Sequence, residues 1–314
     1  MDEVGWVARV TLQISFERGR FMSDRRVSRV GGYRNCRPRL EGLESRELLA
    51  VRVTEVAGVL NIQGDNKANQ VIIYDGEDVP GGYSPGRLEV RYDGGKSFTP
   101  SGPISSINVD LQGGNDSFSY YLGDSQPSPY GQADSQRTLR VSTGNGNDKV
   151  YVQLSGFGYG DGNSPSSIGE GRWDLRFDLG SGNDQFKLDQ YASLTGTATN
   201  STVSANDVYL LVNGGAGNDV MEANFAAVSI SNSYYDVVMR GGAGNDTMTM
   251  RSYGLVSMAD STVNFDRYGE AGDNKLFGQV DYQLASNTMF GHVLDSGNGR
   301  GQVKAIFKGQ SRKA

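Results

Sequence analysis

The chain has 314 residues, of which 37% are hydrophobic and 21% charged, so its composition excludes an intrinsically disordered protein. Its 44 glycines follow no Gly-X-Y period, which excludes collagen. The net charge is −6, and residues 41–314 carry 21 basic and 32 acidic residues, a balance that suits cations better than nucleic acid or an anionic membrane.

The first segment, residues 1–50, is a basic leader with nine arginines and four acidic residues in its first 40 positions. We interpret it as unfolded or processed rather than as a nucleic-acid-binding arm, with Met22 as an alternative start to Met1. The only cysteine, Cys36, lies here, so we expect neither an internal disulfide nor a cysteine-based zinc site. No run of 18 apolar residues occurs anywhere, so we expect no transmembrane helix.

Residues 39–50 (RLEGLESRELLA) resemble the Leu-Glu-Pro-Arg-type motif that opens many exported or surface proteins of some bacteria, with Ser45 in place of the usual Pro or Asp. The resemblance implies export, and a location outside the cell or at the surface of a bacterium. The same residues also fit a short amphipathic helix, because four leucines lie near one face at helical spacing. Both interpretations can hold together.

From Val51 onward the chain repeats one tripeptide, Gly-Asn-Asp. Its aspartates are separated by 32, 36, 35 and 27 residues. Residues 64–69, 269–274 and 297–302 are degenerate copies of the same repeat. Two copies, residues 214–219 and 241–246, share the fuller sequence Gly-Gly-Ala-Gly-Asn-Asp. The five aspartates of the repeat are Asp116, Asp148, Asp184, Asp219 and Asp246.

Alternating apolar runs precede and follow each tripeptide, which predicts a β-strand on both sides. The expected strands before it include residues 107–111, 139–141, 173–179, 208–212 and 235–239. A period of this length indicates a stacked architecture. We therefore predict an all-β, right-handed parallel β-helix or solenoid with about 27–36 residues per rung over residues 51–306, followed by a basic tail at 307–314. Residues 156–171 and 193–206 are expected to form loops at one corner.

The repeated corner predicts a row of oxygen ligands. Glycine allows positive φ, and Asn and Asp stabilise turns through their own side chains. Stacked carboxylates repel one another, whereas calcium binds carboxylate and carbonyl oxygens and would reverse that repulsion. The chain offers no soft ligands for a transition metal. The alternative is that these are good turns that stack by hydrogen bonds without any metal.

Residues 241–249 (GGAGNDTMT) resemble the haemolysin-type, or repeats-in-toxin, calcium-binding nonapeptide Gly-Gly-x-Gly-x-Asp-x-apolar-x, and residues 214–222 match equally well. The resemblance implies that calcium is held between stacked turns, weakly and for a structural purpose. It makes Asp219 and Asp246 carboxylate ligands and places Met221 and Met248 inward. The turn glycines that it implies are Gly215, Gly217, Gly242 and Gly244.

The remaining copies match this pattern less fully, so Asp184, Asp148 and Asp116 are secondary candidates for metal ligands. The family repeats its nonapeptide in direct tandem, whereas these copies are separated by about 18–27 further residues. This spacing favours a wide helix with one corner per rung over a compact two-strand roll.

No catalytic motif is present, and the single histidine, His292, is isolated, so we do not expect an enzyme. A carbohydrate-active β-helix enzyme is the alternative; its candidates, Asp174, Arg176, Asp178 and Lys187, alternate along strands like solvated outer faces. Tyr120, Tyr121, Tyr234 and Tyr235 fit core or edge packing better than a carbohydrate face. The leading hypothesis is an exported, calcium-stabilised solenoid with a structural or adhesive role, whose partner is a cell-surface polysaccharide or another surface protein.

Overall fold

The computed structural model describes residues 51–75, 88–122, 135–154, 167–168, 171–190, 193–195, 207–226, 229–254, 256–284 and 288–311. This part of the chain is all β-structure, in two long sheets of mostly parallel strands. Within these ranges no helix has the length and apolar character needed to cross a membrane. The leader, with its motif and Cys36, lies outside the described residues, as do most of the two expected loops, 156–171 and 193–206.

The first sheet has nine strands. In spatial order they are β1 (Arg52–Val56), β2 (Val59–Gln63), β6 (Ser106–Asp110), β8 (Ser135–Ser142), β11 (Gly171–Asp178), β14 (Asp207–Ala216), β17 (Tyr234–Ala243), β20 (Thr262–Tyr268) and β22 (Met289–Asp295).

The second sheet has fourteen strands, thirteen along one path and a last strand that pairs with β21. They are β10 (Ser167–Ile168), β13 (Ser193–Thr195), β16 (Ser229–Ser231), β19 (Val256–Ala259), β21 (Lys275–Leu284), β18 (Thr247–Ser252), β15 (Val220–Phe225), β12 (Gln185–Gln190), β9 (Lys149–Leu154), β7 (Ser117–Leu122), β3 (Gln70–Asp75), β4 (Leu88–Tyr92), β5 (Lys96–Phe98) and β23 (Gln302–Ser311).

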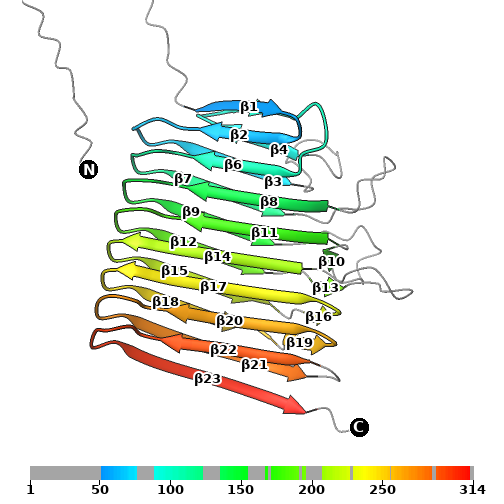
Figure 1. The fold of residues 1–314 in the computed structure, drawn as a ribbon, viewed down its shortest axis with the longest axis vertical. Coiled ribbons are helices and arrows are strands. Elements are labelled where there is room, and N and C mark those ends of the chain that lie inside the picture. Colours follow the sequence, from blue (N-terminus) through cyan, green and yellow to red (C-terminus); the bar gives the residue numbers. More distant parts are fainter. Residues whose placement is uncertain are drawn as a thin grey trace, which may run out of the picture. The chain divides into compact units, whose positions relative to one another are not determined.

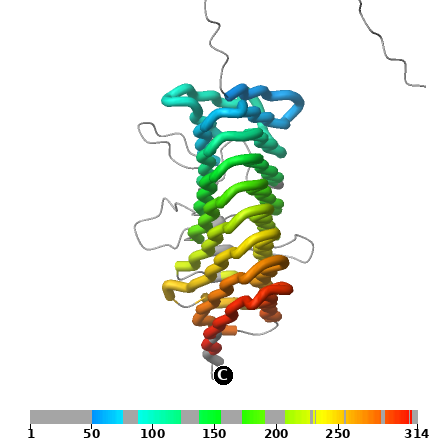
Figure 2. Tube along the Cα trace, turned by 90° about the vertical axis from the view of Figure 1, so that its left-hand side faces the viewer, coloured from blue at the N-terminus to red at the C-terminus, as the bar shows by residue number. Residues whose placement is uncertain are grey.

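From β6 onward the chain passes from one sheet to the other and returns one strand further along each time, as Figure 1 shows by the regular succession of colours. One such circuit through both sheets is called a coil below, and Figure 2 shows the coils lying one above the next. The parallel register keeps equivalent residues side by side; Leu175, for example, lies between Leu139 and Leu210. The strands expected before and after each Gly-Asn-Asp tripeptide are confirmed.

The first strands differ from the rest because they pair in antiparallel fashion. β1 pairs with β2 in this way, and so do β3 with β4 and β4 with β5. All other strand pairs between described strands are parallel. At the far end, β23 continues through residues 307–311, which were expected to form a basic tail.

The hydrophobic core fills the space between the two sheets, and every second residue of a strand points into it. Val141, Phe177, Val212 and Met239 form one such inward row across neighbouring strands of the first sheet, and all are buried. A single coil could not bury its inward face alone, so each coil depends on its neighbours. Burial of a large apolar side chain contributes roughly 1.5–3 kcal/mol.

Candidate cation-binding corners

Each Gly-Asn-Asp tripeptide lies where the chain leaves a strand of the first sheet and enters the second sheet. Residues 217–219, for example, separate β14 from β15, and residues 244–246 separate β17 from β18. Backbone hydrogen bonds join each corner to the next coil: the amide of Gly217 donates to the carbonyl of Ala243 at 2.8 Å. The corners therefore form a continuous column along one side of the sheets.

The glycines are needed because the corners stack so closely. Gly217 has a φ of +143°, and a Cβ at this position would overlap the carbonyl oxygen of Gly182 in the preceding coil. Gly215, Gly242 and Gly244 also have positive φ, and a Cβ on each would likewise overlap a carbonyl oxygen of the preceding coil. These four predicted turn glycines therefore have a steric role that no other residue could take.

The five aspartates of the repeat form a ladder, and all are nearly inaccessible to solvent, with exposures of 0–2%. In each of them Oδ1 accepts a hydrogen bond of 2.7–2.9 Å from the backbone amide of the equivalent residue in the preceding coil. The ladder begins at the amide of Asn69 and ends where the amide of Asp246 donates to Oδ1 of Asn274 at 2.7 Å. Asn69 and Asn274, from two of the degenerate copies, thus form the neutral ends of a column of aspartates.

The other carboxylate oxygen, Oδ2, has no hydrogen-bond partner in any of the five aspartates. At the Asp219 corner the position of this oxygen is defined by Gly214. A Cβ there would lie 2.5 Å from Oδ2 of Asp219 and 2.5 Å from the carbonyl oxygen of Gly241. The two oxygens therefore border the same small space, although both are acceptors. Two acceptors can face each other favourably only with a proton, a cation or a donating water molecule between them.

Asn274 shows how the same space is satisfied by a neutral side chain. Its Nδ2 donates to the carbonyl of Ser296 at 3.1 Å and to that of Gly272 at 3.3 Å. A Cβ on Gly269 would lie 2.6 Å from both Nδ2 of Asn274 and the carbonyl oxygen of Ser296. The amide thus occupies the place of Oδ2 and supplies the donor that the aspartates lack.

A second ladder, on the more exposed side of the corners, is made by the asparagines of the repeat. The backbone amide of each residue donates to the side-chain oxygen of its counterpart in the preceding coil, as Asn218 does to Asn183 at 2.8 Å. It continues through Asp273, whose amide donates to Asn245 at 2.7 Å. This ladder runs in the opposite sense to the aspartate ladder, so the two together fix the stacking from both directions.

Burial disfavours the charged form of every carboxylate in the column. It raises the pKa of Asp116 and Asp184 to about 7 and that of Asp246 to about 6, against an ordinary value of 3.8. Burial also raises the pKa of Asp148 and Asp219. Hydrogen bonds from backbone amides oppose this shift, while neighbouring carboxylates of the column add to it for Asp184. Asp116, Asp184 and Asp246 therefore titrate near neutral pH.

The donor chemistry of the corners fits a hard cation, because every free ligand atom is oxygen. Within the described ranges no three His, Cys, Asp or Glu side chains are grouped so as to hold a metal ion together. A cation at a corner would thus combine one carboxylate with backbone carbonyls, which calcium accepts as ligands. The first-glycine position that frames the shared space is Gly at the Asp219 and Asp246 corners but Leu111, Thr143 and Leu179 at the other three.

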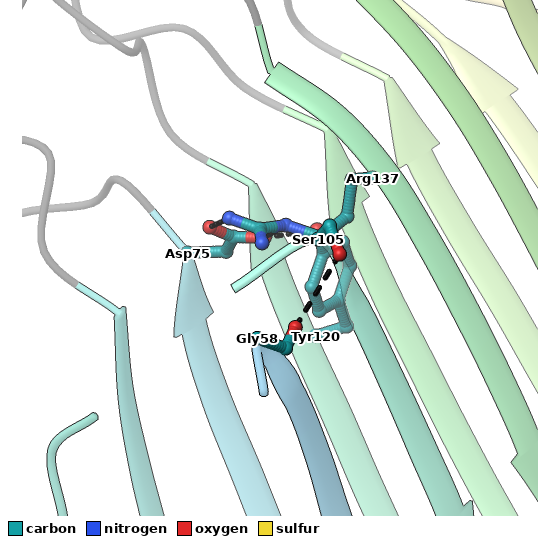
Figure 3. Close-up of polar contacts among 5 residues, drawn as sticks. All are labelled: Gly58, Asp75, Ser105, Tyr120 and Arg137. Atoms are coloured by element: carbon teal, nitrogen blue, oxygen red, sulfur yellow. Dashed lines mark hydrogen bonds and ion pairs between the residues drawn. The ribbon is translucent and has the colours of Figure 1, made fainter. Parts of the chain in front are cut away.

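The opposite side of the core holds a buried ion pair that the repeat does not reveal. Arg137 of β8 crosses to Asp75 of β3, with Nε–Oδ2 and Nη2–Oδ1 distances of 2.7 and 2.8 Å (Figure 3). The hydroxyl of Tyr120 donates to the same carboxylate at 2.7 Å. Burial alone would lower the pKa of Arg137, but the charge of Asp75 raises it overall. The cluster is enclosed, so its role is to join the two sheets.

Of the four residues considered for an enzyme, three share one face and the fourth lies on the other sheet. Asp174, Arg176 and Asp178 lie on the outer face of β11, whereas Lys187 lies on the outer face of the other sheet, in β12. Arg176 pairs with Asp174 at 2.7 Å, and Lys187 pairs with Asp189 at 2.8 Å. The interpretation of these four residues as solvated outer faces agrees with their places.

The remaining candidates also have clear positions. His292 is exposed on β22, beside the ring of Phe290. Tyr120 and Tyr235 are fully buried in the core, as expected, while Tyr234 is 40% exposed on the first sheet. The two predicted inward residues of the fuller repeats, Met221 and Met248, have no exposed surface.

Comparison with known proteins adds no assignment: no family model, no curated protein and no solved structure matches the chain.

Proposed function

We propose that this chain is an exported, non-enzymatic β-solenoid whose Gly-Asn-Asp corners bind calcium, and that it has a structural or adhesive role at a bacterial cell surface. In this proposal the two parallel sheets are the faces of a right-handed parallel β-helix with about 27–36 residues per rung. The export-like motif at residues 39–50 and the absence of a catalytic motif from the sequence support the cell-surface role.

One observation carries the calcium part of the proposal: buried Oδ2 atoms that face a carbonyl oxygen without a donor. Asp219 and Asp246 are the strongest candidates, because Gly214 and Gly241 leave the carboxylate and a carbonyl from the next coil in one space. A divalent cation there would neutralise the repulsion along the column and stabilise the stacked coils. Protons are the competing solution, and they become scarce above the pKa of about 6 of Asp246.

The test is a calorimetric melt at pH 8 in EDTA and in millimolar calcium. We expect calcium to raise the melting temperature, with a gain of about 1–3 kcal/mol per site at 10–100 times the dissociation constant. Magnesium should give a smaller shift, because it requires a stricter octahedral geometry. Isothermal titration of the folded chain should give a stoichiometry of at least one calcium ion.

The matched variants are Asp219→Asn with Asp246→Asn, and Asp178→Asn as control. Asn274 shows that an amide fits this position, so the double variant should fold but lose most of the calcium response. Asp178 is exposed on β11, and its variant should respond to calcium as the natural chain does. A melting temperature of the natural chain that calcium leaves unchanged would falsify calcium binding and leave a metal-free solenoid.

A further inference from the structure

The outer face of the first sheet is hollowed near its centre. Two cavities, of about 520 and 370 Å³, lie side by side on it and share Arg176 of β11. The larger one extends over β2, β6, β8, β11 and β14, and the smaller one over β11, β14 and β17; we call them together the outer groove. Both volumes are within the range that binding sites for small molecules or polymer segments occupy.

Beside the smaller cavity, two outward residues of β17 are covered by their neighbours. Asp236 and Val238 alternate with the core residues Tyr235, Val237 and Met239, so they point away from the core. Nevertheless only 9% of Asp236 and 8% of Val238 is exposed. In addition, Oδ1 of Asp236 has no hydrogen-bond partner. Oδ2 of Asp236 accepts a hydrogen bond from the hydroxyl of Tyr234 at 3.3 Å, so Oδ1 alone remains unsatisfied, beside Tyr209 in the strand register and next to the smaller cavity, which Asp236 itself does not line.

Aromatic rings supply the apolar surface of the smaller cavity. Tyr209 and Tyr234 both line it, and the guanidinium of Arg176 lies 5.6 Å from the ring centroid of Tyr209. Tyrosine has an apolar face and a hydroxyl that can still form hydrogen bonds. Such rings suit a ligand with alternating C–H faces and hydroxyl groups, which is the surface that a sugar ring presents.

Planar polar groups supply the rest of the lining. Asp174 holds the guanidinium of Arg176 through two hydrogen bonds, Nε–Oδ1 at 2.7 Å and Nη2–Oδ2 at 3.1 Å. In the larger cavity, Nδ2 of Asn108 donates to Oδ1 of Asn61 at 3.1 Å. These side chains combine donors with acceptors and are oriented before any ligand arrives, so they fit neighbouring hydroxyl groups.

The charge of the outer groove indicates an uncharged ligand. Three arginines and four aspartates are among the described residues that line it, so the two signs nearly balance. A polyanion such as nucleic acid requires a clear excess of cations. The groove also crosses six neighbouring strands spaced about 4.8 Å apart, which gives it the length of an extended chain.

We propose that the outer groove binds an uncharged polysaccharide, along the direction in which the coils stack. The inference rests on the proposed adhesive role and names its partner class. Its residues are distinct from the Gly-Asn-Asp corners, so the two proposals can fail separately.

The experiment is affinity electrophoresis of the full chain in native gels that contain dextran, galactomannan, xyloglucan or mixed-linkage glucan, with polygalacturonate and alginate as acidic probes. We expect at least one neutral polysaccharide to retard the chain more strongly than either acidic probe. Tyr209→Ala and Tyr234→Ala should each weaken that retardation about tenfold, because truncation of a central aromatic contact commonly costs this much. Arg176→Lys should weaken it less, since the charge remains but the planar fork is lost.

Tyr253→Ala is the matched control, because Tyr253 is 60% exposed and lines neither cavity. It should bind as the natural chain does, and the melting temperatures of all variants should show that they are folded. The proposal is overturned if no neutral polysaccharide retards the chain, if both tyrosine variants bind normally, or if only acidic probes bind. A chain that binds calcium but no polysaccharide overturns the groove alone, and the reverse result overturns the corners alone.

Discussion

Asp75 and the five aspartates of the corners are buried on opposite sides of the same core, but only Asp75 has a counterion within the chain. Asp75 has a bidentate arginine and a tyrosine hydroxyl from its own chain. Each corner aspartate has one backbone amide and an oxygen without a partner. A buried charge is costly unless it is paired. On the side of Asp75 the charge is therefore paired within the chain, although Nη1 of Arg137 has no hydrogen-bond partner, whereas the corner side depends on what the solvent supplies.

The largest effect is expected for Gly217→Ala, which introduces a steric clash between stacked corners. The new Cβ would overlap the carbonyl of Gly182, and the φ of +143° would add backbone strain. We expect a loss of more than about 5 kcal/mol, or failure to fold, measured by urea unfolding. Gly94→Ala is the control, because Gly94 has a φ of +70° but nothing within 4 Å of its Cβ position, so it should lose only about 1 kcal/mol.

The next largest effect is expected when the ion pair of Asp75 is broken. Arg137→Met removes the counterion of Asp75 and leaves a carboxylate with only 7% of its side chain exposed. We expect a loss of about 3–5 kcal/mol in the free energy of unfolding. Arg140→Met, on the same strand but exposed, should stay within about 0.5 kcal/mol of the natural chain.

A double variant separates the pair from its packing. Asp75→Leu together with Arg137→Met removes both charges, and much of the stability should return, because replacing a buried ion pair by apolar residues is often neutral. If Arg137→Met alone costs less than about 1 kcal/mol, Asp75 is not held by its counterion, and the contrast between the two sides disappears.

The third effect is expected when a corner aspartate is replaced by a side chain that carries its own hydrogen-bond donor. Asp246→Asn should keep the acceptor for the amide of Asp219 and supply a donor toward the carbonyl of Gly269, as Asn274 does one coil further on. We expect a gain of about 1–3 kcal/mol at pH 8 in EDTA, since a buried unsatisfied polar group costs about that amount. Saturating calcium should remove this advantage if calcium binds the natural corner.

The pH dependence of this gain has a defined sign. Burial raises the pKa of Asp246 from 3.8 to about 6, so between these values the folded chain holds a proton that the unfolded chain has lost. The stability that the protonated side chain contributes is therefore present below about pH 4 and is lost as the pH rises through about 6. The gain of Asp246→Asn should be small at pH 4 and reach its maximum above pH 6. A gain that is equal at both pH values would contradict a buried titrating carboxylate.

The sequence predicts the strands and the corners because both have local signals. Alternation places residues 173–179 in a strand, and glycine next to Asn and Asp marks the turn. The pair of Arg137 and Asp75 has no such signal, since the partners are 62 residues apart and each interrupts an apolar pattern. The role of Asn274 is also hidden, because its neighbour Asp273 carries the charge and only the register shows which of the two occupies the ladder.

The smallest effect concerns a third buried charge, Arg267, which has neither kind of compensation. Its side chain has no exposed surface, and only Nη1 forms a hydrogen bond, 3.1 Å from the carbonyl of Phe277. Nε and Nη2 have no partner, and burial lowers the pKa of the guanidinium to about 10. Arg267→Met places an apolar chain beside Met239, its neighbour in the register, and should raise the stability by about 1 kcal/mol at pH 7. Because burial lowers the pKa of Arg267 from 12.5 to about 10, the penalty of the charged form is fully present below about pH 9, and the gain should shrink only as the pH rises through about 10. A calorimetric comparison at pH 7 and pH 10.5 measures it, and a loss of stability at pH 7 would contradict the expectation that the buried charge is uncompensated.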